Sequence, residues 1–319
     1  MKPIMAYLPK EFFYDFIRVR VYAFTFSMIL VVGSLVSLAT QGLNFGIDFA
    51  GGILIEARSK EAFDLSATRS ALNEIGLGDV SITTFGDEDR DLMIRVQQQP
   101  GGETAQVAAL KTLQTAIGER FEIRRTEVVG PKVGSELIIN GALAIALALI
   151  GIGVYVWFRF EWQFALGACL SLTHDVISTI GLFSITQAQF DLNTVAAVLT
   201  IAGFSINDTV VVYDRVREML RKYKKMNTPD LLNLSLNKVL SRTLVTNLTT
   251  TLAVLALVTI GGPTLQGFSL AMMWGMFVGS YSTVYIALPV LVSFEMRRED
   301  FTNTQPGVAQ VPEYERQLK

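Results

Sequence analysis

Cysteine and histidine are nearly absent from this sequence of 319 residues, which contains one of each, Cys169 and His174. A single cysteine forms no internal disulfide, a single histidine builds no multi-histidine metal site, and no CxxC or HExxH spacing occurs. Charge is also scarce, because Asp, Glu, Lys and Arg make up 18% of the chain and nearly cancel at a formal net charge of −2. We therefore expect no metal, no cofactor and no nucleic-acid partner.

Hydrophobic residues, by contrast, make up 50% of the chain, and the mean hydropathy is +0.40. A bilayer core about 30 Å thick needs about 20 apolar residues in a helix, because backbone polar groups must be satisfied internally there. Six windows meet this need, at residues 21–39, 138–158, 164–185, 192–213, 239–260 and 267–294. The first is longer than a normal signal-peptide core, so we expect an uncleaved anchor. The sequence predicts an α-helical polytopic membrane protein with six transmembrane helices, and no enzyme.

Lysine and arginine predict the orientation of these spans. The segment 214–238 carries seven of them against three acidic residues, whereas the short connections 186–191 and 261–266 carry none. The positive-inside rule makes 214–238 a cytoplasmic basic loop and places both termini in the cytoplasm. An N-terminal cytoplasmic segment, 1–20, and a cytoplasmic tail, 295–319, follow from this orientation.

Residues 41–132, between the first two spans, form the only stretch long enough for a separate domain, which the orientation places outside the cytoplasm. Alternation and turn residues predict strands at 52–58, 80–85, 92–96 and 121–129, a helix capped by Ser66 and running to about Ile75, and a helix at 103–117. The order βαββαβ is the ferredoxin-like arrangement. We expect an exported ferredoxin-like α+β domain, a fold that by itself says nothing about chemistry.

Three of the six windows contain ionisable side chains, which are costly in lipid and usually face a partner or a water path. Asp208 lies at least one full turn inside the cytoplasmic end of the fourth window, and Arg242 lies near the start of the fifth. Membrane depth disfavours the charged form of a carboxylate whereas a nearby guanidinium favours it, so such a pair suits proton exchange. The alternative is a structural ion pair. The sequence leaves open whether Asp208 faces Arg242 or a group on another subunit.

Further polar residues accompany this pair. His174 and Asp175 lie near the middle of the third window, where we expect a hydrogen-bonded polar knot between helices. Asn207, beside Asp208, and Thr246, on the helical face of Arg242, are candidate polar supports.

Three glycines, Gly46, Gly51 and Gly52, flank Asp48 where the first span enters the exported domain. Glycine tolerates positive φ, so these positions suit either a hinge or a tight structural turn. The sequence assigns no role to Asp48.

Three motifs carry a family resemblance: Gly-Ile-Asp-Phe-Ala-Gly-Gly at 46–52, Val-Gly-Pro-Lys-Val-Gly at 129–134, and Ser-Ile-Asn-Asp-Thr-Val-Val-Val-Tyr-Asp-Arg-Val-Arg-Glu at 205–218. Through these motifs, and over nearly the whole chain, the sequence resembles the SecF subunits of the bacterial Sec protein-export machinery. Asn247 departs slightly from the family pattern, where Ser is common after Arg-Thr-Leu-x-Thr.

The resemblance implies one half of a transporter of the resistance-nodulation-division type in the bacterial inner membrane, with SecD as the other half. The SecYEG channel, YajC and the translocating preprotein are the implied partners. The family is understood to use the proton-motive force to promote late stages of preprotein translocation, and its proton-pathway residues carry over to Asp208 and Arg242. The proton is then the coupling ion.

Three other functions compete with this interpretation. A passive assembly subunit would use the same polar residues only to hold the translocase together. An intramembrane aspartyl protease would need Asp175 and Asp208 to share a proton, which Arg242 would suppress, and neither Asp lies in a Gly-x-Gly-Asp context. A lipid or small-molecule exporter half is opposed by the motif at 205–218.

Overall fold

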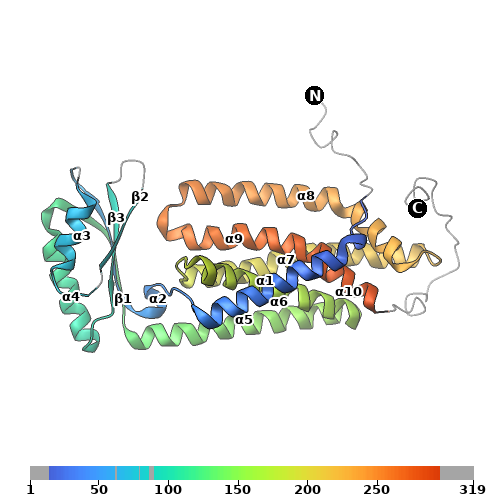
Figure 1. Cartoon of the computed structure of the whole chain (residues 1–319), viewed down its shortest axis with the longest axis horizontal. Helices are drawn as coiled ribbons and strands as arrows, with labels where there is room; N and C mark the ends of the chain where they lie inside the picture. Colours follow the sequence, from blue (N-terminus) through green and yellow to red (C-terminus); the bar gives the residue numbers. More distant parts are fainter. Residues whose placement is uncertain (1–13, 62, 79, 86–89, 295–319) are drawn as a thin grey trace, which may run out of the picture.

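The computed structural model describes residues 14–61, 63–78, 80–85 and 90–294. A sheet domain lies at one end of a long helix bundle, so the molecule is elongated (Figure 1). Residues 1–13 of the expected cytoplasmic N-terminal segment and the whole expected tail, 295–319, lie outside the described residues.

Six helices are long and apolar enough to cross a membrane. They are α1 (Arg20–Thr40, preceded by a 3-10 turn at Ile17–Val19), α5 (Pro131–Arg159), α6 (Trp162–Thr186), α7 (Leu192–Lys222), α8 (Thr228–Ile260) and α9 (Gly262–Ser282). The last helix continues through a π-helical segment, Thr283–Ala287, into α10 (Leu288–Ser293). Each predicted window overlaps one of these helices, so the six predicted spans are confirmed.

Burial separates the six helices into two groups. The inner helices α6, α7 and α9 bury much of their apolar length inside the chain, whereas α1, α5 and α8 bury little. In Figure 1, α8 and α5 lie on opposite sides of the bundle. Arg242 therefore belongs to an outer helix, although Asp175 and Asp208 belong to inner ones.

Small residues allow the inner helices to approach closely. A Cβ atom on Gly279 of α9 would lie 3.2 Å from the Cβ of Ser205 on α7, and one on Gly275 would overlap Ile201. Gly279 is therefore a site of close helix packing, whereas a Cβ on Gly203 would meet nothing within 4 Å. This approach brings the polar side chains of α7 and α9 within reach of each other.

The sheet domain has the element order β1 (Gly52–Ser59), α3 (Leu65–Asn73), β2 (Val80–Phe85), β3 (Asp91–Gln97), α4 (Gly102–Ile117) and β4 (Phe121–Val129). The strand order is β2-β3-β1-β4, and all neighbouring strands are antiparallel. Alternate side chains, such as Ile53, Ile55 and Ile94, are fully buried beneath the helices with Leu113 of α4. The four predicted strands and the two helices are confirmed, with small shifts at their ends.

The cap of α3 differs from the prediction. Asp64, not Ser66, precedes the helix, and its Oδ1 accepts hydrogen bonds from the backbone N–H groups of Ser66 (2.8 Å) and Ala67 (3.2 Å). An aspartate carboxylate satisfies two unpaired N–H groups at once, so the helix begins at Leu65, two residues earlier than a cap at Ser66 predicts.

The predicted basic loop 214–238 is mostly helical. Helix α7 continues to Lys222 and α8 begins at Thr228, so only residues 223–227 connect them. Asn227 caps α8 by accepting from the N–H of Asp230 (2.8 Å), and Leu231–Asn237 are buried against the bundle. Hydropathy underestimated the lengths of α7 and α8, because both helices continue into polar sequence beyond the predicted apolar windows.

The glycine motif forms a tight turn between the bundle and the sheet. After the short helix α2 (Ile47–Ala50), Gly51 and Gly52 have φ of 74° and 138°, whereas Gly46 has an ordinary φ of −68°. The N–H of Gly46 donates to the carbonyl oxygen of Phe190 (2.8 Å). Only two of the three candidate hinge glycines therefore need glycine for their backbone conformation.

Replacing Gly52 by Ala is expected to lower the free energy of unfolding by more than about 1 kcal/mol. The new Cβ would lie 2.5 Å from the carbonyl oxygen of Val96, at a φ that L-residues rarely adopt. Thermal unfolding in detergent measures the change. Gly151→Ala, a helical site where a Cβ meets nothing within 4 Å, is the matched control. Equal stability of the two variants would contradict this role.

Candidate functional site

Asp175 is the centre of a hydrogen-bonded cluster inside the helix bundle. This fully buried carboxylate on α6 accepts from the hydroxyl groups of Ser205 on α7 (2.6 Å) and Ser282 on α9 (2.8 Å), both at Oδ2. The hydroxyl of Ser171 donates to that of Ser282 (2.8 Å). One side chain thereby ties together all three inner helices, which is the polar knot that the sequence suggested for this position.

The helix α9 changes its geometry beside this cluster. Its π-helical segment begins at Thr283, directly after Ser282, and the hydroxyls of Thr283 and Thr209 lie 2.9 Å apart. Local π-helical turns are frequent at functional sites because they shift a helix face relative to its neighbours. Beside it, Ser282 contacts Ser171 and Asp175 on α6, whereas Thr283 contacts Thr209 on α7.

His174 extends the cluster toward α1. Its Nδ1 lies 3.1 Å from Oδ1 of Asp175, and its ring lies 6.2 Å from the ring of Tyr281. The hydroxyl of Tyr281 donates to the carbonyl oxygen of Ala23 on α1 (2.7 Å). The buried Nε2 of His174 has no hydrogen-bond partner among the residues that the structure describes.

Asp208 has a different environment from Asp175. It is 5% exposed near the middle of α7, and its buried Oδ2 lacks a hydrogen-bond partner in the described part of the chain. Helix α8 presents Asn247 and Arg242 to it. Asn247 donates to the hydroxyl of Ser280 (2.6 Å), and its own oxygen is likewise buried without a partner among described residues. Two acceptor oxygens therefore lack a donor hydrogen here.

The other predicted site residues lie toward the outside. Arg242 is exposed on α8 and forms no ion pair with Asp208 within the described chain, and Asn207 is also exposed. The hydroxyl of Thr246 donates to the carbonyl oxygen of Arg242 (3.0 Å), within its own helix. The structure brings Asp208 near Arg242 and places Asp175 with His174, but Asp175 and Asp208 share no hydrogen bond among the described residues. A shared-proton dyad, which the protease alternative needs, is not formed by these two side chains.

The start of α7 is held by two carboxylates. Asp191 accepts from the N–H of Thr194 (2.8 Å), and Asp48, from the glycine motif, accepts from the N–H of Leu192 (2.9 Å). Arg95 of β3 lies nearby; burial lowers the pKa of its guanidinium, and the charges of Asp191 and Asp48 oppose that change. Asp48, to which the sequence gave no role, thus links the segment that leads into the sheet domain to the helix that carries Asp208.

Replacing Asp48 by Ala is expected to destabilise the chain by about 1 kcal/mol, because the first N–H of α7 loses its acceptor near the positive end of the helix dipole. Asp48→Asn keeps an acceptor oxygen and should retain most of that stability. Thermal unfolding of the two variants in detergent measures the difference, and equal loss in both would show that charge, not capping, matters here.

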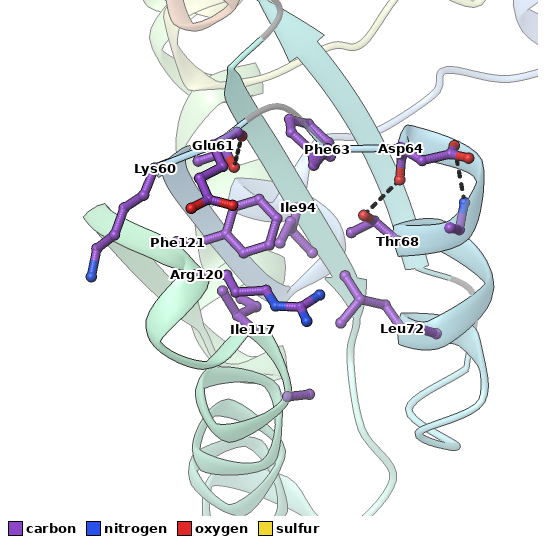
Figure 2. A pocket seen from close by; sticks show the side chains of 14 residues that line it. Lys60, Glu61, Phe63, Asp64, Thr68, Leu72, Ile94, Ile117, Arg120 and Phe121 are labelled. Atoms are coloured by element: carbon purple, nitrogen blue, oxygen red, sulfur yellow. Dashed lines mark hydrogen bonds between the residues drawn. The ribbon is translucent and has the colours of Figure 1, made fainter.

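A hollow of about 860 Å³ lies on the sheet domain (Figure 2). Leu72, Ile94 and Ile117 line it, and the rings of Phe63 and Phe121 meet edge to face at 5.4 Å. The hydroxyl of Thr68 donates to the carbonyl oxygen of Asp64 (2.7 Å), which belongs to the cap of α3. Asp64 and Thr68 thus serve the start of α3. The described residues contain no cluster of His, Cys, Asp or Glu able to hold a metal ion.

Six helices that are long and apolar enough to cross a membrane, buried polar side chains between them and a four-stranded domain define the class of multi-pass membrane proteins. Residues 109–297 match the family described as "Protein export membrane protein SecD/SecF, C-terminal", and residues 36–62 match the SecD/SecF GG motif. The chain belongs to the SecD/SecF family and is a multi-pass protein of the inner membrane.

Relatives of similar length support this membership. The chain is 44% identical over 298 residues to the protein translocase subunit SecF of Rickettsia akari, covering 91% of this chain and 95% of that protein. It is 43% identical over 305 residues to the SecF of Rhodobacter capsulatus, covering 91% of this chain and 92% of that protein. The family resemblance read from the sequence is therefore confirmed.

A solved structure shares the fold. The crystal structure of SecDF from Thermus thermophilus, described as a translocon-associated membrane protein, matches with a TM-score of 0.77 and 32% sequence identity. The match covers 90% of this chain and 39% of that one. The longer protein thus contains a region like this chain and a further region outside the match.

Sequence reasoning missed Ser205, Ser282 and Asn247 as neighbours of the two buried carboxylates. Ser282 lies in a window without ionisable side chains, so its hydroxyl carried no evident signal. The spacing of Ser280, Ser282 and Thr283 around a helix that faces α6 and α7 was the available clue. Only helix packing reveals which of these hydroxyls meet a carboxylate.

Proposed function

We propose that this chain is a SecF-like translocase subunit that uses the proton-motive force, together with SecD, to promote late stages of preprotein translocation. In this proposal Asp208 is the proton carrier and Arg242 the charge that responds to it. The chain performs no covalent chemistry, needs no cofactor beyond the coupling proton, and works with the SecYEG channel, YajC and the emerging preprotein.

The observation that carries the proposal is the buried, unpartnered oxygen of Asp208 in the described chain. A proton on Asp208 would turn its unpartnered oxygen into an O–H donor, and the unpartnered oxygen of Asn247 could accept that hydrogen. Loss of that proton would leave a carboxylate attracted to Arg242. The two protonation states thus favour different packings of α7 against α8.

The energies are compatible with such a switch. Each proton that crosses 100 mV supplies about 2.3 kcal/mol, and moving a two-state element from 1:99 to 99:1 needs about 5.5 kcal/mol. About three protons therefore suffice. The contact between Asp48 and the start of α7 is the route by which helix motion would reach the exported domain.

The proposal includes an orientation and a domain assignment. Both termini and the basic segment 214–238 face the cytoplasm, and residues 41–132 form a periplasmic domain. Its ferredoxin-like assignment is supported by the antiparallel strand order β2-β3-β1-β4 and by the order of its helices and strands. Relation to transporters of the resistance-nodulation-division type is part of the same proposal.

The test replaces Asp208 by Asn in cells depleted of their own copy of the chain. Export of a secreted reporter and co-purification with SecD are measured together. Loss of export from an intact complex supports proton coupling through Asp208, and normal export from an intact complex overturns it.

A passive assembly subunit is the second candidate, and the Asp175 cluster favours it. Two of the three hydrogen bonds of that carboxylate, from Ser205 and Ser282, join α6 to α7 and α9, as a packing device would. If the passive function is correct, Asp208→Asn lowers recovery of the complex instead of uncoupling proton use.

A further inference from the structure

The ends of α5 and α7 that lie away from the sheet domain line a basic hollow of about 590 Å³. Arg159, Asp214, Arg217, Glu218, Arg221 and Lys222 line it. The proton-coupling proposal uses none of these residues.

The carboxylates around this hollow are already engaged. Asp214 holds Arg159 through two hydrogen bonds, of 2.9 and 3.1 Å. Glu161 lies 3.4 Å from Arg217. Glu218 pairs with Arg215. These three pairs account for the acidic side chains of the cluster.

Two cations remain without a carboxylate partner among the described residues. Arg221 and Lys222 are both exposed in the last turn of α7, and the ammonium of Lys222 lies 4.9 Å from the centre of the Tyr223 ring. The guanidinium groups of Arg159 and Arg217 are held over the ring of Phe160, at 5.0 and 5.4 Å. The hollow thus has two oriented guanidinium groups and two uncompensated positive charges.

The hollow lies at the depth of lipid headgroups. Helix α7 has 31 residues and is about 46 Å long at a rise of 1.5 Å per residue. A bilayer including its headgroups is about 40–45 Å thick, so a helix that spans it ends among the headgroups. Arg221 and Lys222 occupy that end.

Exposed aromatic side chains flank Arg159 in the sequence, at the end of α5 that lines the hollow and at the start of α6. On α5, Trp157 and Phe158 are 65% and 88% exposed, and Trp162 at the start of α6 is 54% exposed. Tryptophan is enriched where a membrane protein meets the headgroup region, and large exposed aromatic surfaces of this kind face lipid. The aromatic residues therefore favour lipid over a soluble protein as the neighbour of the hollow.

We propose that this basic hollow binds the phosphate of an anionic phospholipid, with Arg221 and Lys222 supplying the uncompensated charge. Arg159 and Arg217 form its floor, and the lipid's acyl chains lie along the apolar outer face of α5. Phosphate is matched by the planar guanidinium groups, and basic residues at the membrane surface attract anionic headgroups. The site is independent of proton coupling.

The experiment uses tryptophan fluorescence of the full chain in phosphatidylcholine vesicles that contain a minor fraction of brominated lipid. Trp157 and Trp162 lie beside the hollow, so brominated phosphatidylglycerol should quench fluorescence more than brominated phosphatidylcholine does. The double variant Arg221→Gln, Lys222→Gln is expected to reduce the preference for phosphatidylglycerol by about 30-fold at low ionic strength.

Two further variants make the result specific. Lys60→Gln with Lys111→Gln removes the same charge from exposed sites of the sheet domain and should leave the preference unchanged. Arg221→Lys keeps the positive charge and should retain most of the preference for phosphatidylglycerol. If excess inorganic phosphate abolishes the preference for phosphatidylglycerol, the hollow binds phosphate as such, and free phosphate competes with the lipid headgroup for it. Equal quenching by the two brominated lipids in the unaltered chain overturns the proposal, as does an unchanged preference in the Arg221, Lys222 double variant.

Discussion

Export of a secreted reporter should fall to the level of depleted cells when Asp208 is replaced by Asn. Asparagine has nearly the same shape but its neutral amide does not ionise near neutral pH, so the buried site beside Asn247 would stay in one charge state. The neutral amide avoids the cost of a buried charge, and the helices should still pack. We therefore expect SecD to co-purify in normal amounts while export is lost.

The control for this result is Glu136→Gln, the same change of carboxylate to amide at an exposed position on α5. It should export normally. If Asp208→Asn instead reduces the recovered complex in proportion to export, the residue acts in assembly. Normal export from an intact complex would show that Asp208 is no essential carrier.

Replacement of Asp175 should lower the stability of the chain, whereas replacement of Asp208 should lower export without loss of the complex. Asp175→Leu removes the acceptor of three hydrogen bonds, from Ser205, Ser282 and His174. At an average of about 0.6 kcal/mol for a hydrogen bond between membrane helices, the loss is about 2 kcal/mol, and unpaired hydroxyls add to it. Unfolding of the purified chain by denaturing detergent should therefore begin at a lower detergent fraction.

Two variants calibrate this prediction. Ser171→Ala removes only the hydrogen bond to Ser282 and should cost about 0.6 kcal/mol. Asp175→Asn keeps an acceptor oxygen and should lie between the leucine variant and the unaltered chain. If Asp175→Leu were as stable as the unaltered chain but inactive in export, Asp175 would be part of the proton path and not of the packing.

The family and the helical architecture were predictable from the sequence because they depend on local properties. A run of about 20 apolar residues must form a helix in lipid, wherever its neighbours lie. Short-range patterns similarly predict the strands at 52–58 and 121–129. The motif at 205–218 identified the family for the same reason, since it is contiguous in the chain.

The partners of the buried polar groups could not be predicted in this way, because they come from distant parts of the chain. Ser205 and Ser282 reach Asp175 only because Gly279 lets α9 approach α7, and that contact joins residues on three helices. Asp48 caps α7 although 144 positions separate it from Leu192. The sequence by itself determined six apolar helices, the βαββαβ element order and the family, because these depend on local patterns. Tertiary packing decided that both oxygens of Asp175 have hydrogen-bond partners, whereas one oxygen of Asp208 has none among the described residues.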